Sequence, residues 1–337
     1  MTSVKAFEVE TEPTATTLGR GAFVFSDDYS VFDWGRMPDE IPEKGRTLCL
    51  MGAANFEALE TAGIPTHYRG VTADGRTGRT TELEKPPRRM EIELTRVPEL
   101  PFRDGSYDYE AYHAAGGENY LVPLEIVFRN RVPIGSSLRS RTEPDDHDLG
   151  IAAWPDHDIE LAAPIVECST KFEESDRYLD AEEAEAIAGA ASLEELRRLA
   201  HEVNELITDR AADAGLDHLD GKIEVLYHQG ELKVADVVGT FDENRFAYEG
   251  TQVSKEVIRQ YYARTDPEWV EAVTAAKREA RQRDVADWRA LCTRSPAELP
   301  QPMIELASDL YRSGANAYLG DRWFDAPPLR TVVRRVE

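Results

Sequence analysis

One stretch near residue 230 constrains the fold more than any other part of the chain. Residues 222–246 read KIEVLYHQGELKVADVVGTFDENRF, and two apolar runs flank Gln229-Gly230. This pattern predicts two antiparallel strands joined by a tight turn. Each run nevertheless contains one acidic residue, Glu224 or Asp236. A buried carboxylate needs a charged or hydrogen-bonding partner, so the hairpin indicates a functional site as well as a fold.

The length of the connecting loop decides how the two carboxylates lie. A two-residue turn at Gln229-Gly230 would pair Glu224 with Ala235 and direct Asp236 to the opposite face. A loop of three or five residues would instead set Glu224 across from Asp236, with Cβ atoms about 5 Å apart. Two facing carboxylates repel each other unless a cation lies between them, and Mg²⁺ that also binds phosphate oxygens suits such a pair. The residues alone leave both registers open, and an ordinary surface hairpin remains the simpler alternative.

Cationic and hydroxyl side chains occur where they could hold an anion. Lys222 lies two residues before Glu224 on the same strand face and could contact a phosphate. The apolar run at 120–130 leads into Arg129 and Arg131, followed by a turn that contains Gly135 and Ser136. Arginines at a strand end beside a Gly-Ser turn are typical of a phosphate or carboxylate site. A basic edge loop with no ligand is an equally simple interpretation of this second group.

Charge and composition exclude several classes of protein. The chain has 64 acidic residues against 39 Lys and Arg, a net charge of −25, and only eight of the cations are lysine. Such a chain would repel nucleic acid. Acids spread along the length with few lysines are typical of a high-salt cytosol, where the Debye length is about 3 Å at 1 M. We find no apolar run long enough to span a membrane, no secretion signal and three scattered cysteines, so we expect a cytoplasmic enzyme.

The order of predicted elements favours an α+β or mixed α/β enzyme. Short strands and one helix come first, then a strongly apolar strand, a helical stretch in two pieces, the hairpin and further helices after Pro267. Residues 102–119 are rich in Gly, Tyr and Asp and predict a surface excursion. The sequence contains no dinucleotide fingerprint, P-loop, nucleophile elbow or zincin motif. The acidic clusters DDHD and PDHD (145–148 and 155–158) are interpreted as solvated loops.

Several of these segments together resemble the SAICAR synthetase (phosphoribosylaminoimidazole-succinocarboxamide synthase) family. That family carries PxExVxRNR followed by GS, which is similar to Pro123 through Ser136 here. Its D-x-K-x-E motif is similar to residues 220–224, and an Asp follows twelve residues later, as Asp236 does. Its P-D-x-x-R motif is represented by Asp242 and Arg245. Shorter matches in the same order are SVFD (30–33), KG (44–45), GIPTH (63–67) and SKEVIRQYY (254–262).

The resemblance implies an ATP-dependent ligase. ATP would phosphorylate the carboxylate of carboxyaminoimidazole ribotide (CAIR), and the amine of L-aspartate would displace phosphate to give SAICAR. The resemblance also implies a role for each matching residue. Catalysis would depend on Lys222, Lys171 and Asp220; the substrates would be bound by Arg129, Ser136, Arg245, Asp242 and Asp176; ATP would be bound by Lys222, Glu224, Asp236, Arg20 and Lys44; and Mg²⁺ would be held by Glu224 and Asp236. With this resemblance we expect the odd-length loop, in which the two carboxylates face each other.

The resemblance implies an architecture as well. We expect a β-rich N-terminal lobe over residues 1–121, packed on an ATP-grasp-like lobe with C-terminal helices over residues 122–337. The ligands would be small molecules, and a homo-oligomer would be an ordinary assembly.

The chain departs from the family in its N-terminal ATP loop. That loop has the form GKxKxxY, whereas the nearest sequence here is LGRGAFVF (18–25), which lacks both lysines. Arg20 could substitute for one of them, or Lys5 could reach the nucleotide from the first strand. The altered loop leaves two alternatives to consider: a paralogous ligase for another carboxylate or amine, and a nucleotide-binding protein without catalytic activity.

Overall fold

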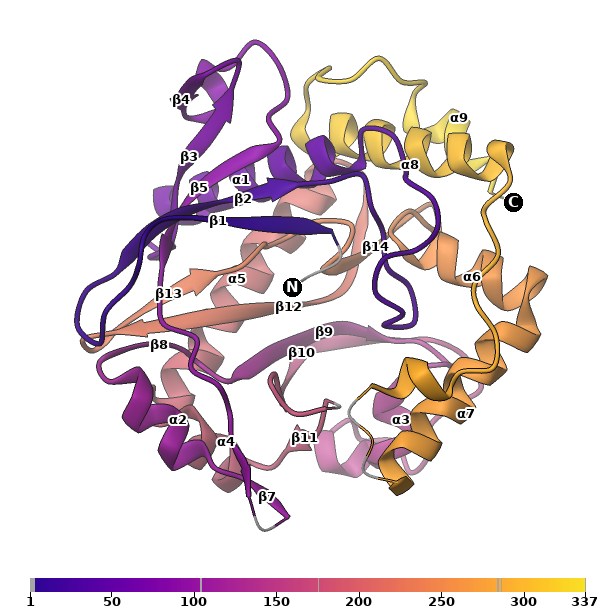
Figure 1. Ribbon diagram of the computed structural model, residues 1–337. Helices are drawn as coiled ribbons and strands as arrows, with labels where there is room; N and C mark the ends of the chain where they lie inside the picture. Colours follow the sequence, from indigo (N-terminus) through magenta and orange to yellow (C-terminus); the bar gives the residue numbers. More distant parts are fainter. Residues whose placement is uncertain (1–3, 104, 175, 284, 286, 337) are drawn as a thin grey trace.

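The computed structural model describes residues 4–336 except 104, 175, 284 and 286, and it is a mixed α and β structure (Figure 1). Its strands are β1 (Lys5–Thr11), β2 (Gly19–Phe25), β3 (Tyr68–Ala73), β4 (Arg76–Gly78), β5 (Arg89–Leu94), β6 (Phe102–Arg103), β7 (Ser106–Tyr107), β8 (Asn119–Leu121), β9 (Leu124–Val132), β10 (Ile159–Thr170), β11 (Tyr178–Leu179), β12 (Asp217–His228), β13 (Glu231–Ala235), β14 (Asn244–Tyr248) and β15 (Thr251–Gln252). Its α-helices are α1 (Lys44–Thr61), α2 (Tyr109–Gly116), α3 (Ser137–Arg141), α4 (Ala181–Ala188), α5 (Leu193–Asp213), α6 (Glu256–Thr265), α7 (Pro267–Arg283), α8 (Gln301–Leu319) and α9 (Leu329–Val333), and the 3₁₀ turns are η1 (Thr80–Glu82), η2 (Pro144–His147) and η3 (Trp288–Leu291).

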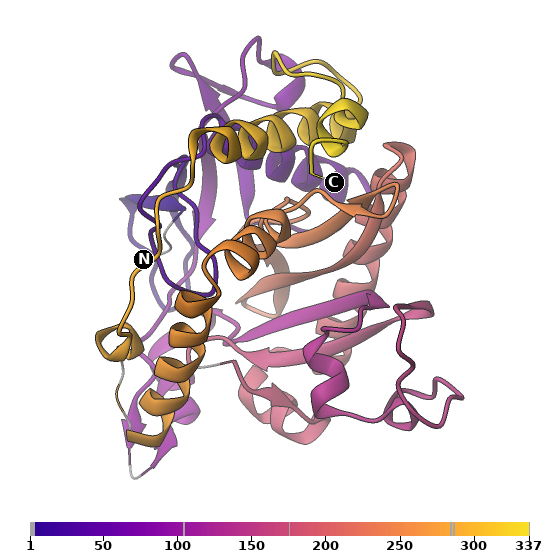
Figure 2. The ribbon, with the colours of Figure 1, turned by 90° about the vertical axis from the view of Figure 1, so that its right-hand side faces the viewer.

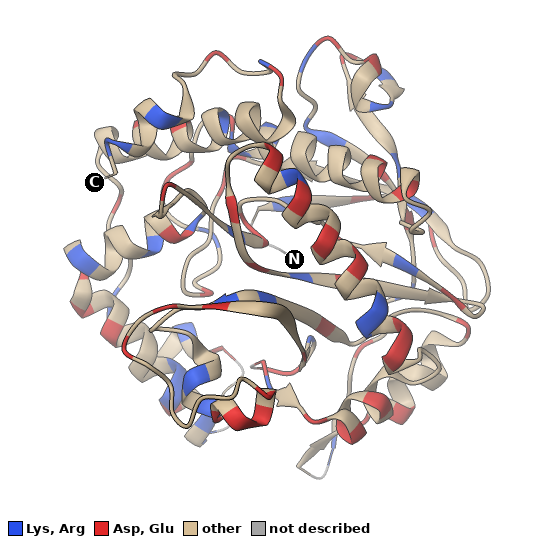
Figure 3. Cartoon of the chain, turned by 180° about the vertical axis from the view of Figure 1, so that it is seen from behind, with Lys and Arg blue, Asp and Glu red and all other residues tan. Residues whose placement is uncertain are grey.

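Two large sheets organise the chain. The first contains five antiparallel strands in the order β1-β2-β5-β3-β4, and α1 packs against it through buried residues such as Leu48, Met51 and Phe56. The second follows the order β11-β10-β9-β12-β14-β15, with β8 and β13 paired to the far half of β12. Helix α5 crosses the back of the second sheet, as Figure 3 shows, and its apolar stripe covers that face. The opposite face of this sheet is therefore free to carry a site.

The strand β12 is twelve residues long and pairs with four other strands of the second sheet. Its first half pairs with β9 and β14, while its second half pairs with β13. The outer edge of β13 reaches the segment before β3, where the Val234 amide donates to the Pro65 carbonyl oxygen over 2.9 Å. At the side-chain level, the Lys233 ammonium lies 2.7 Å from a Glu93 carboxylate oxygen on β5. The hairpin thus links the two sheets and fixes their relative position.

The hairpin has a two-residue turn, so the expected odd-length loop is wrong. His228 pairs with Glu231, and Gln229 and Gly230 form the turn with positive φ values of 51° and 90°. Positive φ at both turn positions matches the right-handed twist of the flanking strands, which is why this turn type is favoured. Glu224 consequently pairs with Ala235 rather than with Asp236.

Other expectations from the sequence fare differently. The early helix (α1), the helical stretch in two pieces (α4 and α5) and the break at Pro267 are confirmed, and the Ser192 hydroxyl caps α5. The apolar run at 120–130 is two strands, since Pro123 interrupts the ladder between β8 and β9. The excursion at 102–119 contains the helix α2, whose N-terminus is capped by the Asp108 carboxylate. The helix was not predicted because residues 102–119 are rich in Gly and Tyr, which are weaker helix formers than Ala or Leu.

The last helices return to the start of the chain. Helix α8 lies along α1 at the top of Figure 1, and Figure 2 shows α6 and α7 running down one side of the large sheet. The Tyr318 hydroxyl donates to Asn55 Oδ1 over 2.8 Å, and the Ser308 hydroxyl donates to the Pro42 carbonyl oxygen over 2.7 Å. The division into lobes at residues 121 and 122 stays a prediction. Among the residues described, no helix is both long and apolar enough to cross a membrane.

Candidate active site

A polar cavity of about 690 Å³ opens on the face of the large sheet away from α5. Its walls come from β9, β12, β14, the turn before α3 and the start of α6. Among the charged and hydroxyl side chains that line it are Glu125, Arg129, Ser136, Asp176, Asp220, Lys222, Asp242 and Arg245. We call this space the main cavity. Seven of these eight residues, all except Glu125, are ones that the sequence predicted for the site.

Three neighbouring strands align a row of charges on the cavity floor. Arg129 on β9 and Arg245 on β14 are both register partners of Asp220 on β12, one on each side. Arg245 Nε lies 2.8 and 3.0 Å from the two Asp220 oxygens, and Arg129 Nη1 lies 3.7 Å from one of them. Asp220 therefore holds both guanidinium groups at the centre of the floor. Two arginines that share one carboxylate retain N–H donors for an anionic ligand.

Lys222 continues this row along β12 and is held between two acids. Its ammonium lies 2.5 Å from Glu125 Oε1 and 3.6 Å from Glu243 Oε2. Burial alone would lower the pKa of Lys222, but Glu243, Glu125 and Glu224 raise it well above its ordinary value. Lys222 is therefore fully protonated at neutral pH and acts as a fixed positive charge.

Glu224 and Asp236 do come together, although by a route that the strand register does not provide. Asp236 follows the last residue of β13 and adopts a left-handed conformation with φ of 62°, which takes its side chain out of the strand alternation. Its carboxylate pairs with the Lys5 ammonium, and Glu224 pairs with Lys171. The Lys171 ammonium also lies 3.9 Å from Glu125. These residues form one carboxylate–lysine cluster: Lys5, Lys171, Lys222, Glu125, Glu224 and Asp236.

Glu224 and Asp236 have pKa values that are shifted in opposite directions. Burial and the nearby Asp236 carboxylate raise the pKa of Glu224 to about 7, against the opposing effect of Lys171 and Lys222. Burial would also raise the pKa of Asp236, but Lys5 and Lys171 lower it below its ordinary value. Asp236 is thus the permanent anion, whereas Glu224 holds a proton for part of the time at neutral pH. A further cation near Glu224 would favour its ionised form.

A third buried group adjoins the main cavity. Lys44, the first residue of α1, is fully buried and lies 2.7 Å from Asp242 Oδ2, while the Tyr311 hydroxyl lies 2.6 Å from Asp242 Oδ1. Burial would raise the pKa of Asp242, but Lys44 and Lys255 lower it to about 2. Burial lowers the pKa of Lys255, which lines the main cavity. Lys44 therefore anchors Asp242 inside the protein.

The structure separates the predicted residues into three groups. Five of them line the floor of the main cavity: Arg129, Asp220, Lys222, Asp242 and Arg245. Four others, Lys171, Glu224, Asp236 and Lys44, lie beside the cavity in ion pairs. Ser136 and Asp176 lie at the cavity wall, and burial together with Glu125 raises the pKa of Asp176. Arg20 is exposed on β2 and does not line this cavity, so its assignment to ATP stays a prediction.

Sequence reasoning assigned no role to several residues of the site. Glu125 lies inside the PxExVxRNR motif, and Glu243 follows Asp242; Lys255 and Arg259 lie inside SKEVIRQYY. Each belongs to a matched segment, and that position was the signal available. Lys5, which was considered only as a substitute for the missing loop lysines, contacts Asp236. Among the residues described, no group of three or more His, Cys, Asp or Glu side chains forms a metal site unaided.

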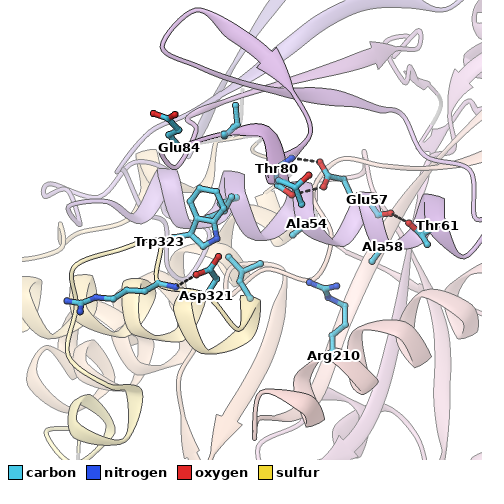
Figure 4. Close-up of a pocket in the computed structure, with 14 residues that line it drawn as sticks. Ala54, Glu57, Ala58, Thr61, Thr80, Glu84, Arg210, Asp321 and Trp323 are labelled. Carbon is cyan, nitrogen blue, oxygen red and sulfur yellow. Dashed lines mark hydrogen bonds between the residues drawn. The ribbon is translucent and has the colours of Figure 1, made fainter.

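A second cavity of about 820 Å³ lies elsewhere, between α1, η1 and the segment after α8 (Figure 4). Trp323, Asp321, Arg210 and Glu57 line it. The Glu57 carboxylate is already engaged, because it accepts from the Tyr68 hydroxyl over 2.7 Å and from the Thr80 hydroxyl over 2.6 Å. Among the residues described around this cavity, none was predicted for the site. We therefore assign the chemistry to the smaller main cavity.

The fold and the main cavity define a class of protein, an enzyme that binds an anionic ligand on a sheet beside a carboxylate–lysine cluster. Comparison with known proteins narrows this class. A model of the SAICAR synthetase family matches residues 14–276. A relative from Archaeoglobus fulgidus, provisionally described as a phosphoribosylaminoimidazole-succinocarboxamide synthase, is 42% identical over 343 residues, with 100% of this chain and 99% of the relative covered. The chain belongs to the SAICAR synthetase family.

Other known proteins agree. The phosphoribosylaminoimidazole-succinocarboxamide synthase of Thermoplasma acidophilum is 31% identical, over 89% of this chain and 93% of its own length. Among solved structures, the Saccharomyces cerevisiae SAICAR synthase in complex with SAICAR has a TM-score of 0.62 at 20% identity, with 96% of this chain and 95% of that chain covered. A type-2 SAICAR synthetase in complex with ADP has a TM-score of 0.53 at 20% identity, covering 88% and 99%. These structures support the fold.

Proposed function

We propose that this chain is an ATP-dependent carbon–nitrogen ligase that joins L-aspartate to the carboxylate of CAIR, giving SAICAR, ADP and phosphate in purine biosynthesis. ATP transfers its terminal phosphoryl group to the CAIR carboxylate to form an acyl phosphate. The aspartate amine then attacks the acyl carbon, and phosphate leaves as the amide forms. Family membership over the full length supports this reaction, and so does the Arg129–Asp220–Arg245 row beside the carboxylate–lysine cluster.

The cations of the main cavity suit the anionic substrate. Arg129, Arg245 and the Ser136 hydroxyl would bind the phosphate and carboxylate of the ribotide, while Asp220 keeps both guanidinium groups oriented. Lys222 lies further along β12 and connects this row to the carboxylate–lysine cluster through Glu125. Acyl phosphate formation depends chiefly on positioning and charge neutralisation, so preorganised cations are the main requirement. Lys222 and Lys171 would neutralise charge that develops on the transferred phosphoryl group.

The second half-reaction requires an uncharged amine. The aspartate ammonium must lose a proton before its nitrogen can attack the acyl phosphate. Asp176 lies at the cavity wall, and its raised pKa makes it a better proton acceptor than an ordinary aspartate. Asp242, with its pKa of about 2, stays ionised and keeps Lys44 in place.

Glu224 and Asp236 fit a magnesium ion. Glu224 is buried and Asp236 is partly buried, their charges repel, and hard oxygen ligands of this kind hold Mg²⁺ together with phosphate oxygens and water. When bound, the ion would neutralise the nucleotide phosphates. Lys5 and Lys171 are the counter-ions of these two carboxylates, and each would be released toward a nucleotide phosphate when the ion binds. We propose that Lys5 thereby supplies a cation that the short N-terminal loop lacks, with Arg20 as a second contact.

The family match does not favour the alternative of a ligase for another carboxylate or amine. The charged side chains that line the main cavity, together with family membership, argue against the non-catalytic alternative. We further propose a cytoplasmic location and adaptation to high salt, on the strength of the composition.

An assay of the complete reaction tests the function. Purified protein in molar KCl with Mg²⁺, ATP, CAIR and L-aspartate should release ADP and form SAICAR, measured by a coupled enzyme and by mass spectrometry. Omitting CAIR or aspartate should stop SAICAR formation. Replacing aspartate with glutamate or asparagine tests the amine. ADP release only with a different amine would favour the paralogous ligase, and no turnover with any substrate would refute both ligases.

A further inference from the structure

A layer of uncharged polar side chains lies beneath the floor of the main cavity, between the large sheet and α5. Asn130 exchanges two hydrogen bonds with Asn204 on α5, with distances of 2.9 and 2.8 Å. His218 on β12 follows, with its Nδ1 atom 2.8 Å from the Thr208 hydroxyl and its Nε2 atom 3.0 Å from the Asn244 amide. This layer spans β9, β12 and β14, the three strands that carry the charged row on the other face.

An irregularity in β12 places His218 in this layer. Residues 218 and 220 would share a face in a regular strand, because side chains alternate. The ladder to β14 pairs His218 with Phe246 and Asp220 with Arg245, so Leu219 is an extra residue. The resulting bulge turns His218 away from the cavity while Asp220 stays on its floor. The imidazole then stacks on the Phe246 ring, with centroids 5.0 Å apart.

The strand β12 also makes room for the Asn244 side chain. Asn244 is 2% exposed and is the register partner of Gly221. A Cβ atom at Gly221 would lie 1.6 Å from Asn244 Nδ2 and 2.7 Å from the Phe128 ring. Such a contact is impossible, so only glycine at 221 admits the amide between the strands. The close fit holds the Asn244 side chain in one position between β12 and β14.

The His218 imidazole is uncharged, and three polar groups contact its ring nitrogens. Burial lowers the pKa of His218 to about 4, so the imidazole is neutral and carries one proton. Its Nε2 atom lies 3.0 Å from Asn244 Nδ2, and its Nδ1 atom lies 2.8 Å from the Thr208 hydroxyl and 3.3 Å from Asn130 Nδ2. Asn244 Oδ1 is buried with no partner among the residues described.

The neighbours of Asn244 are the residues that the site uses. Glu243 precedes it and contacts Lys222, and Arg245 follows it and clamps Asp220. Side-chain alternation puts Glu243 and Arg245 on the cavity face when Asn244 is held on the α5 face. We propose that His218 and Asn244 are positioning residues, which fix the start of β14 on β12 so that Arg245 and Glu243 present a preformed floor to the anionic substrate. This inference rests on the proposed function and concerns two residues to which that function assigned no role.

Steady-state kinetics of His218→Leu, Asn244→Ala and the double variant test the proposal. Each single change frees β14 from the ring, so we expect the KM for CAIR to rise about tenfold, with kcat and the KM for ATP within about twofold. Because the two residues act as one unit, the double variant should also lose about tenfold rather than a hundredfold. Asn316→Ala is the matched control, because it removes a side-chain amide that hydrogen-bonds to the backbone of Trp323 and Phe324. It should lower the unfolding free energy without changing either KM.

The outcomes are distinct. Kinetic losses equal to those of Asn316→Ala, or additive losses in the double variant, would overturn the positioning role. If His218→Leu does not fold, His218→Gln, which keeps a polar group toward Asn244, takes its place and should retain a KM for CAIR closer to wild type than that of Asn244→Ala. An equal rise for both would also overturn the proposal. Absence of ligase activity in the wild-type protein would instead contradict the proposed function.

Discussion

Glu224 illustrates how a single residue can be unfavourable for the folded state and still be required. Glu224 is 7% exposed, and its carboxylate is close enough to that of Asp236 for the two charges to repel. Glu224 also shares the Lys171 ammonium with Glu125. A buried pair of like charges is tolerated when a ligand supplies the missing positive charge. We therefore interpret Glu224 as a residue retained for its ligand.

Glu224→Gln should abolish turnover and leave the fold intact. The amide is nearly isosteric but cannot provide the negative charge that a magnesium–nucleotide complex requires, so we expect kcat to fall by at least about a hundredfold. ADP release and circular dichroism measure the two effects. Glu231→Gln, at the exposed end of the same hairpin, is the control and should retain turnover. Turnover near the wild-type rate in Glu224→Gln would refute the metal assignment.

The raised pKa of Glu224 makes stability depend on pH. In the folded ligand-free protein the carboxyl keeps its proton up to about pH 7, whereas in the unfolded chain it loses the proton near 4.5. The unfolded state thus binds fewer protons between these values, so the unfolding free energy falls as the pH rises from about 4.5 to 7. The loss specific to this residue is on the order of 3 kcal/mol.

Denaturant unfolding of wild type and Glu224→Gln across this pH range, without Mg²⁺, measures that term. We expect the wild-type value to fall relative to the variant as the pH rises. Added Mg²⁺ and nucleotide should reverse the trend in the wild type only. Parallel curves for the two proteins would show that Glu224 titrates normally.

Among the elements, the β12–β13 hairpin shows what the sequence could predict and what it could not. The turn position and the two strands follow from alternation and from Gln229-Gly230. The two acids belong to the carboxylate–lysine cluster, and their role in a functional site stays a prediction. The predicted register was wrong because it assumed that the second strand stays regular as far as residue 236, so that Asp236 would pair with Glu224. The left-handed backbone at Asp236 is a local exception that no periodicity reveals in a non-glycine residue.

The remainder of the site divides in the same way. Motifs carried by strands, such as Asp220 with Lys222 and Arg129 with Arg245, come together because ladder registers align them. Lys5 and Tyr311 could not have been placed, because they arrive from β1 and α8, far away in the chain. Contacts between distant segments depend on how the sheets and helices pack, which local patterns do not encode.

The turn itself provides a prediction at this scale. Gly230→Ala should destabilise the protein by about 1–2 kcal/mol, because alanine is strained at φ of 90° even though nothing lies within 4 Å of the new Cβ. Gly135→Ala is the matched control, since that glycine also has open space around it but no positive φ. Its unfolding free energy should stay within about 0.5 kcal/mol of wild type. Equal denaturation midpoints for both variants would contradict the strained turn.

Charge governs the behaviour of the whole molecule. Acidic residues are distributed over helices and loops of the back face in Figure 3, and the net charge is −25. At low salt these charges repel across the surface, whereas at 1 M salt the Debye length shrinks to about 3 Å and the repulsion is screened.

Raising KCl from 0.05 M to 2 M should therefore raise the midpoint of thermal unfolding by at least about 10 °C, measured by calorimetry. Sorbitol at matched osmolality should have a much smaller effect, because it does not screen charge. A midpoint that is unchanged or lower in KCl would contradict salt adaptation.

The packing of α8 on α1 has a consequence for synthesis on the ribosome. The buried face of α1 includes Asn55, whose amide oxygen accepts from Tyr318, more than 250 residues later. When the first sheet and α1 have left the exit tunnel, their cover has not yet been translated. The early segments therefore wait with an apolar helix face exposed, and the native core closes only when the last helices emerge. The surface of α1 is therefore completed only after residues 301–319 of α8 have been translated.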